Sequence, residues 1–160
     1  MEPITAKITH FLTEIGIAVR PANLTGPCIL PGIRIENGVI LFDESQLLYP
    51  GDLLHEAGHL AVMTTEERQQ SGSDTGDNGG FEIAAIAWSY AAALHLAIDP
   101  AIVFHANGYK GGGEFIVENF SGEHYIGVPV LQWIGMTLEP KNAKLQGVAP
   151  YPHMLRWKRA

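Results

Sequence analysis

One pentapeptide, His55-Glu56-Ala57-Gly58-His59, restricts the possible folds of this chain more than any other segment. On an α-helix, residues four apart lie on one face, about one turn from each other. Two imidazoles at that spacing can bind one zinc ion, and Glu56, rotated by about 100°, can reach a water on the metal. We therefore predict a helix over residues 53–68 that carries zinc on His55 and His59, with Glu56 as the general base.

A catalytic zinc ion takes three protein ligands and leaves one position for water. Glu82 is our candidate for the third ligand, because it opens a predicted apolar core helix over residues 81–98, where a carboxylate needs a partner. A favourable charge at a helix N-terminus or a buried ion pair would also explain Glu82. His95 lies about 20 Å from Glu82 along that helix, so the two cannot share one metal. The rival ligands are Asp74, Asp77, His95 and His105.

The first half of the chain reads as a helix, a loop and a hairpin. Apolar residues at helical spacing predict a helix over residues 4–17, and three prolines predict a connecting loop over residues 20–31. Asn37-Gly38 between two β-branched runs predicts a hairpin over residues 33–42. Asp52 is predicted to cap the zinc-bearing helix.

The second half has weaker patterns. Residues 70–80 are predicted to be a loop, and residues 114–126 a strand pair around Ser121-Gly122. A last helix is predicted over residues 129–138, followed by a loop-like tail over residues 139–160. This tail is basic, with five of the ten Lys and Arg residues of the chain, and we expect a solvated tail that docks on an acidic body, with binding to an acidic partner as the alternative.

Composition limits the class of protein. The chain has 160 residues, 46% apolar and 17% charged, which suits one folded domain spanning residues 1–160. A net charge of −7 disfavours nucleic acid as the primary partner, and no apolar run is long and uncharged enough for a membrane span. Cys28 is the one cysteine, so no internal disulfide can form, and it is predicted to be buried. With no secretory signal visible at the N-terminus, we expect a cytoplasmic protein.

The order of these elements resembles the small gluzincin-type zinc metallopeptidases, in particular the ImmA/IrrE group. Ile15-Gly16-Ile17 and the hairpin before the zinc-bearing helix look like that group. So does Glu82 when it is followed by Ala85, Trp88 and Ser89, whereas Ile86 departs from the group's frequent asparagine. The resemblance covers about residues 4–98. It implies an α+β fold with a zincin-like (minigluzincin) core, in which a hairpin or small antiparallel sheet packs on two metal-bearing helices, and it implies a protein or peptide substrate.

These residues together predict a zinc-dependent hydrolase, most plausibly a metallopeptidase, in which Glu56 activates a zinc-bound water. A hydrolase of non-peptide substrates and a non-catalytic regulatory protein that retains the metal are the alternatives. The oxyanion of the reaction needs a second donor besides zinc, and we select Tyr109 in the glycine-rich loop. The other candidate donors are Tyr90, His105, His124 and Tyr125.

Overall fold

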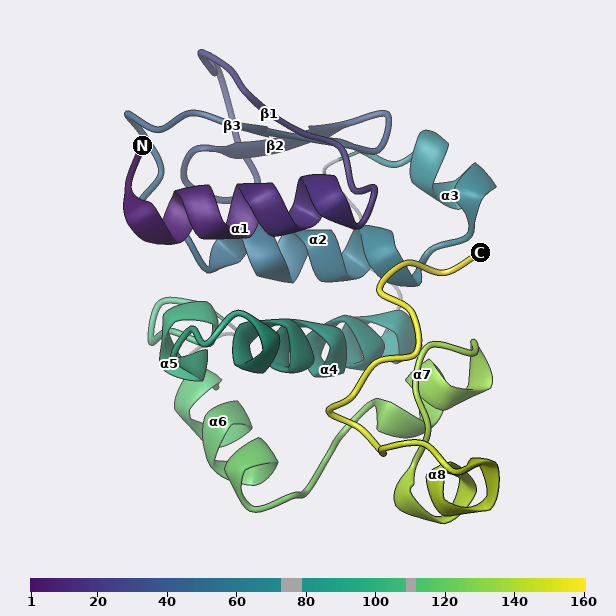
Figure 1. Ribbon diagram of the computed structural model, residues 1–160. Helices are drawn as coiled ribbons and strands as arrows, with labels where there is room; N and C mark the ends of the chain where they lie inside the picture. The colour runs from purple at the N-terminus through teal and green to yellow at the C-terminus, as the bar shows by residue number, and fades with distance from the viewer. Residues whose placement is uncertain (73–78, 109–111) are drawn as a thin grey trace.

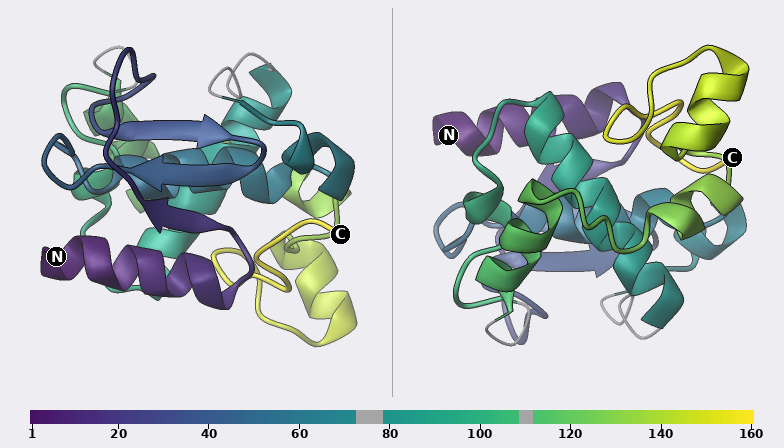
Figure 2. Two further views of the ribbon diagram at one scale, coloured as in Figure 1. Left: turned by 90° about the horizontal axis from the view of Figure 1, so that it is seen from above. Right: turned by 90° about the horizontal axis from the view of Figure 1, so that it is seen from below.

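The chain is layered around one central helix, α4 (Gly79–His95), in the computed structural model of the protein (Figure 1). The structure describes residues 1–72, 79–108 and 112–160. A small sheet forms the outer layer, α1 (Pro3–Glu14) and α2 (Asp52–Val62) lie between the sheet and α4, and the helices that follow α4 in the sequence lie on its other sides (Figures 1 and 2). The fold is therefore α+β, as predicted.

The sheet has three strands in the order β1-β3-β2. β2 (Ile33–Glu36) and β3 (Val39–Phe42) form the predicted hairpin, and Asn37 and Gly38 both take the positive φ angles that its tight turn requires. β1 (Val19–Pro21) pairs in parallel with β3. The sheet is thus mixed rather than antiparallel, and the expected loop over residues 20–31 begins as a strand.

The predicted helix over residues 53–68 is two helices. α2 ends at Val62, and α3 (Thr65–Gln69) begins after a break. Thr64 and Glu67 form a capping box, in which each side chain accepts a hydrogen bond from the other residue's backbone N–H. The sequence carries this signal, Thr64-Thr65-Glu66-Glu67, inside the apolar pattern that suggested one continuous helix.

Helix α4 is apolar on nearly all sides, and such helices are buried. Alanines and Trp88 fill most of its surface, so neighbouring helices approach closely. The helix ends at His95, earlier than predicted, and Asp99 caps the short α5 (Pro100–Val103). None of the described helices combines the length and the apolar character needed to cross a membrane.

The C-terminal third differs most from the predictions. Residues 114–126 contain a helix, α6 (Gly113–Ser121), instead of a strand pair. The predicted helix over residues 129–138 is shorter, α7 (Val128–Trp133), and the supposedly loop-like tail contains α8 (Pro140–Gln146). α6 forms where its Phe120 packs under Tyr90 of α4, a contact that local propensity does not encode.

The last ten residues pack along the core, with Tyr151 and Met154 buried. The Trp88 indole N–H donates to the carbonyl of Trp157, and the Tyr151 hydroxyl donates to the carbonyl of Ala87. Trp157 also packs edge-on against Phe11 of α1. Cys28, predicted to be buried, is half-buried in the loop before β2.

Candidate metal centre

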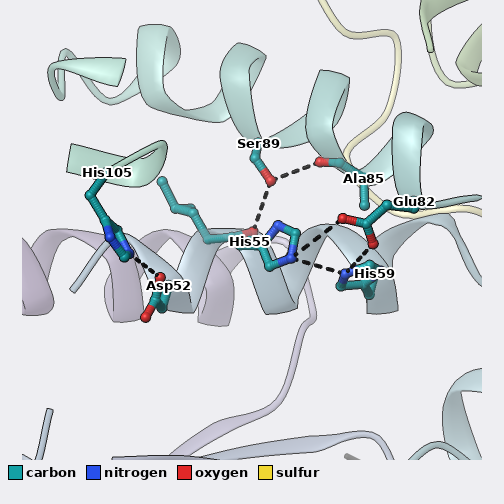
Figure 3. Close-up of polar contacts among 8 residues, drawn as sticks. Asp52, His55, His59, Glu82, Ala85, Ser89 and His105 are labelled. Carbon is teal, nitrogen blue, oxygen red and sulfur yellow. Dashed lines mark hydrogen bonds and ion pairs between the residues drawn. The ribbon is translucent and has the colours of Figure 1, made fainter. Parts of the chain in front are cut away.

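Helix α2 presents His55 and His59 on the face that packs against α4 (Figure 3). The helix begins after Gly51, with Asp52 as its first residue, and its apolar residues are buried between the sheet layer and α4. Helical spacing therefore brings the two imidazoles together, with ring centroids 4.6 Å apart and ring planes nearly perpendicular. The predicted pairing of these histidines is confirmed.

Glu82 reaches the same point from the first turn of α4. Its carboxylate oxygens lie 3.0 Å from His59 Nε2 and 3.8 Å from His55 Nε2, and the two Nε2 atoms are 3.2 Å apart. One ligand atom from each of these residues lies within 4.8 Å of the others. Within residues 1–72, 79–108 and 112–160, no other group of three or more His, Cys, Asp or Glu side chains has this geometry.

The electrostatics of the three residues are coupled. Burial and the neighbouring His59 lower the pKa of His55 to about 4. Burial opposes protonation of His59, but its hydrogen bond to Glu82 and the charges of Glu56 and Glu82 raise its pKa. Burial also opposes ionisation of Glu82, yet the histidines outweigh it and lower the pKa of the carboxyl. Near neutral pH the group thus holds an unprotonated imidazole and a carboxylate, as metal binding requires.

Glu56 lies next to the first histidine and is buried, with 3% of its surface exposed. Its charge contributes to the raised pKa of His59, which places its carboxylate within electrostatic reach of the cluster. It does not belong to the group of potential metal ligands among the described residues. This separation from the ligand set is what a general base beside a metal requires.

The close approach of α2 and α4 depends on small residues. A Cβ atom at Gly58 would lie 2.8 Å from the carbonyl oxygen of Ala85. The Ser89 hydroxyl lies at that crossing, within hydrogen-bond distance of the carbonyl oxygens of Ala85 and Leu54, at 2.7 and 3.2 Å (Figure 3). Sequence reasoning assigned no role to Gly58, although glycine inside a helix pattern is a signal for close packing.

His105, a rival ligand and a candidate oxyanion donor, is engaged elsewhere. Its Nε2 lies 2.7 Å from Asp52 Oδ1 (Figure 3). Its Nδ1 accepts a hydrogen bond from the Asn107 backbone N–H, and its ring stacks on Tyr49. Since Nδ1 accepts, the proton sits on Nε2 and is donated to Asp52. His105 therefore joins the residues after α5 to the start of α2.

The same contact explains why the capping prediction for Asp52 was wrong. Its side chain makes no cap hydrogen bond, and Gly51 occupies the cap position. The carboxyl is buried, and burial raises its pKa while the hydrogen bond to His105 opposes the rise. Within the described part of the chain, its Oδ2 has no hydrogen-bond partner. Asp52 and His105 are 53 positions apart in the sequence, and this separation hides the pair from sequence reasoning.

The remaining candidates do not join the cluster. His95 is at the far end of α4, packed on Phe11 and Trp157. Tyr90 is buried against Phe120, His124 is exposed, and Tyr125 packs on Phe120 and Tyr151. Tyr109, Asp74 and Asp77 lie outside the described residues.

We compared the chain with protein-family models, with curated proteins and with solved structures, and none of them matches it. The convergence of His55, His59 and Glu82 is therefore the observation from which a function is inferred.

Proposed function

We propose that this protein is a zinc-dependent hydrolase with a zincin-like core, and that its substrate is a peptide or protein. The observation that carries the proposal is the meeting of His55, His59 and Glu82 from two packed helices, with Glu56 buried beside them. A three-residue ligand set leaves one coordination position open, which is characteristic of catalytic zinc, whereas structural zinc takes four protein ligands.

The donor chemistry fits zinc. Two imidazole nitrogens and one carboxylate oxygen are the donors of many hydrolytic zinc sites, and the three side chains already face one another without large rearrangement. When bound there, zinc would polarise a carbonyl group and lower the pKa of a water molecule.

Glu56 supplies the proton transfers. Its carboxylate takes a proton from the attacking water as the water oxygen bonds to the peptide carbonyl carbon. It then delivers that proton to the amide nitrogen as the carbon–nitrogen bond breaks, so the products are a free acid and a free amine. Burial of Glu56 suits this role, because a buried side chain has few alternative positions.

Two features favour a peptide substrate. The resemblance of residues 4–98 to small metallopeptidases implies one, and β2 is an edge strand of the sheet, to which an extended peptide could add by backbone pairing. Tyr109 remains our candidate for the donor that stabilises the oxyanion, and a loss of turnover in Tyr109→Phe with unchanged zinc affinity would support it.

Metal content is the first test. Elemental analysis of protein purified without chelators is expected to find zinc in a one-to-one ratio with the chain. His55→Ala and Glu82→Ala should weaken zinc binding by orders of magnitude. Glu66→Ala, which removes an exposed carboxylate from α3, should not. Asp74→Ala and Asp77→Ala belong in the same series, because a loss of zinc in either would replace Glu82 as the third ligand.

Hydrolysis is the second test. The zinc-loaded protein is incubated with a library of quenched fluorescent peptides, and cleavage products are identified by mass spectrometry. Glu56→Gln is expected to bind zinc and fold normally but to lose hydrolysis, because glutamine keeps the shape of the side chain and cannot accept the proton. Near wild-type turnover in this variant would remove Glu56 as the base. Zinc binding without cleavage of any peptide would favour the non-catalytic alternative.

A further inference from the structure

The C-terminal end of α2, just past the metal ligand His59, is held by two arginines. The last carbonyls of a helix have no partners inside the helix. Here Arg68 donates to the carbonyls of Leu60 and Met63. Arg159 donates to the two carbonyls between them. Its backbone N–H donates to Ala61 at 2.8 Å, and its guanidinium donates to Val62 at 3.3 Å.

Arg159 also contacts the second metal-bearing helix. Its guanidinium carbon lies 5.8 Å from the centre of the Phe81 ring, within the range of a cation–π interaction. Phe81 immediately precedes Glu82. One side chain therefore bridges the residue before the third ligand and the helix end just after the second ligand.

The backbone of this segment is fixed from both sides. The carbonyl of Arg159 accepts a hydrogen bond from Arg68, and the carbonyl of Trp157 accepts one from Trp88 of α4. Figure 1 shows the C-terminal segment running past α4 and ending near the α2–α3 connection. The backbone of residues 157–159 is thus anchored to α3 and α4, and this anchoring places the Arg159 side chain between the end of α2 and Phe81.

This bridge lies next to His59 and Glu82, whose donor atoms must be accurately spaced to bind one metal ion. Zinc–oxygen and zinc–nitrogen contacts are about 2.0–2.2 Å, and a site displaced by about 0.5 Å loses much of its performance. His59 and Glu82 come from different helices, so the spacing of α2 and α4 at this end sets the distance between their donor atoms, now 3.0 Å.

We propose that Arg159 is a positioning residue of the metal centre, which sets the spacing between the end of α2 and the start of α4 and thereby holds His59 and Glu82 at ligand distance. The inference rests on the zinc site proposed above. It goes beyond it by assigning a role in metal binding to a residue that is distant in sequence and touches no metal.

A purely electrostatic role predicts the opposite effect. A cation near the site repels a zinc ion, so its removal would tighten zinc binding. The nearby Glu67, whose pKa Arg159 helps to lower, offsets part of that charge. A positioning role predicts weaker binding, so the sign of the change separates the two.

The test measures zinc affinity by competition with a chromogenic chelator, together with the thermal unfolding of the metal-free protein. Arg159→Ala is expected to weaken zinc binding by about tenfold or more, the range found when residues that orient metal ligands are removed. Arg159→Lys keeps the charge but not the planar donor group, so its zinc affinity should lie between those of the wild type and Arg159→Ala. Lys158→Ala is the matched control, because this neighbouring cation contacts Gly16 and neither of the helices α2 and α4. The zinc affinity of this variant should differ from that of the wild type by less than about twofold.

A double-mutant cycle with Glu82→Ala completes the test. If Arg159 acts through Glu82, its removal should cost little further affinity once Glu82 is gone. Unchanged or tighter zinc binding in Arg159→Ala, equal losses in Lys158→Ala, or additive losses in the double mutant would each overturn the inference. If Arg159→Ala does not fold, Arg159→Lys decides in its place. Absence of zinc binding by the wild-type protein would overturn the proposed function instead.

Discussion

Gly58 lies where helix α2 crosses α4. A Cβ atom there would come within 2.8 Å of the Ala85 carbonyl oxygen, 3.0 Å of the Ser89 hydroxyl and 3.3 Å of the Trp88 ring. Two of these neighbours are held rigidly, since one is helix backbone and the other is a fully buried indole. Any larger residue at this position must therefore push the two helices apart.

We expect Gly58→Ala to lower the free energy of unfolding by about 1–2 kcal/mol, because crowding in a packed core outweighs the gain of about 1 kcal/mol in helix propensity. Urea unfolding of the metal-free protein measures the change. Gly122→Ala is the control, since its Cβ would meet only ordinary contacts of 3.5 Å or more. A Gly58→Ala protein as stable as the control would show that the crossing of α2 and α4 has room for a methyl group.

Asp43 predicts a pH dependence at the same scale. Hydrogen bonds from Ser45, Leu24 and Gln46 lower the pKa of its carboxyl from 3.8 to about 2. A folded-state pKa below the unfolded value stabilises the protein above pH 3.8 and stops doing so as the pH falls toward 2.

We therefore expect the wild-type protein to lose more thermal stability between pH 5 and pH 2 than Asp43→Asn, which has no carboxyl to protonate. Thermal unfolding at a series of pH values measures both proteins. Parallel curves for the two proteins would mean that this carboxyl does not contribute to acid unfolding.

At the scale of elements, the β2–β3 hairpin contacts α3, the helix that follows α2. Gly38 sits at its turn with φ of 78°, and its backbone N–H donates to the carbonyl of Ser71. A Cβ atom there would lie 2.3 Å from the Arg68 carbonyl oxygen. The turn therefore requires glycine for two reasons, its backbone conformation and the closeness of α3.

Gly38→Ala is expected to cost more stability than Gly135→Ala. Both positions have left-handed backbones, with φ of 78° and 81°, so both should lose about 1–2 kcal/mol from backbone strain. Only Gly38 adds a clash, because a Cβ atom at Gly135 meets nothing within 4 Å. The difference between the two urea unfolding midpoints measures the cost of the clash between the hairpin and α3. Equal midpoints would mean that this contact adds no cost.

For the whole molecule, the C-terminal residues connect elements that are far apart in the sequence. Trp157 contacts α1 and α4, Arg159 contacts α2 and α4, and Tyr151 hydrogen-bonds to the middle of α4. The sequence suggested a loop-like basic tail. In the fold, the segment instead closes one side of the core beside the candidate metal site.

Tyr151→Phe tests this closure. The buried hydroxyl donates to the Ala87 carbonyl at 2.7 Å, and its loss should lower the free energy of unfolding by about 1 kcal/mol. Tyr125→Phe removes a hydroxyl from a partly exposed ring and should change stability by less than about 0.5 kcal/mol. Chemical denaturation compares the two, and equal stabilities would mean that the Tyr151 hydrogen bond adds nothing to the closure.

Features governed by neighbouring residues could be predicted from the sequence. The spacing of His55 and His59 follows from helix geometry, and the hairpin follows from Asn37-Gly38. Glu82 was reached by a chemical argument, that a carboxylate in an apolar helix needs a partner, and the structure places it beside both histidines. The hydrolytic function and the metal's identity stay predictions.

Contacts between distant segments were decided only by the tertiary structure. Local patterns in residues 114–126 suggested strands, but short segments have weak preferences, and packing of Phe120 under Tyr90 selected a helix. The Asp52–His105 pair and the bridge from Arg159 to α2 and α4 join residues separated by 53 or more positions. No periodicity or turn signal encodes such pairs, because they exist only once burial has brought the chain's layers together.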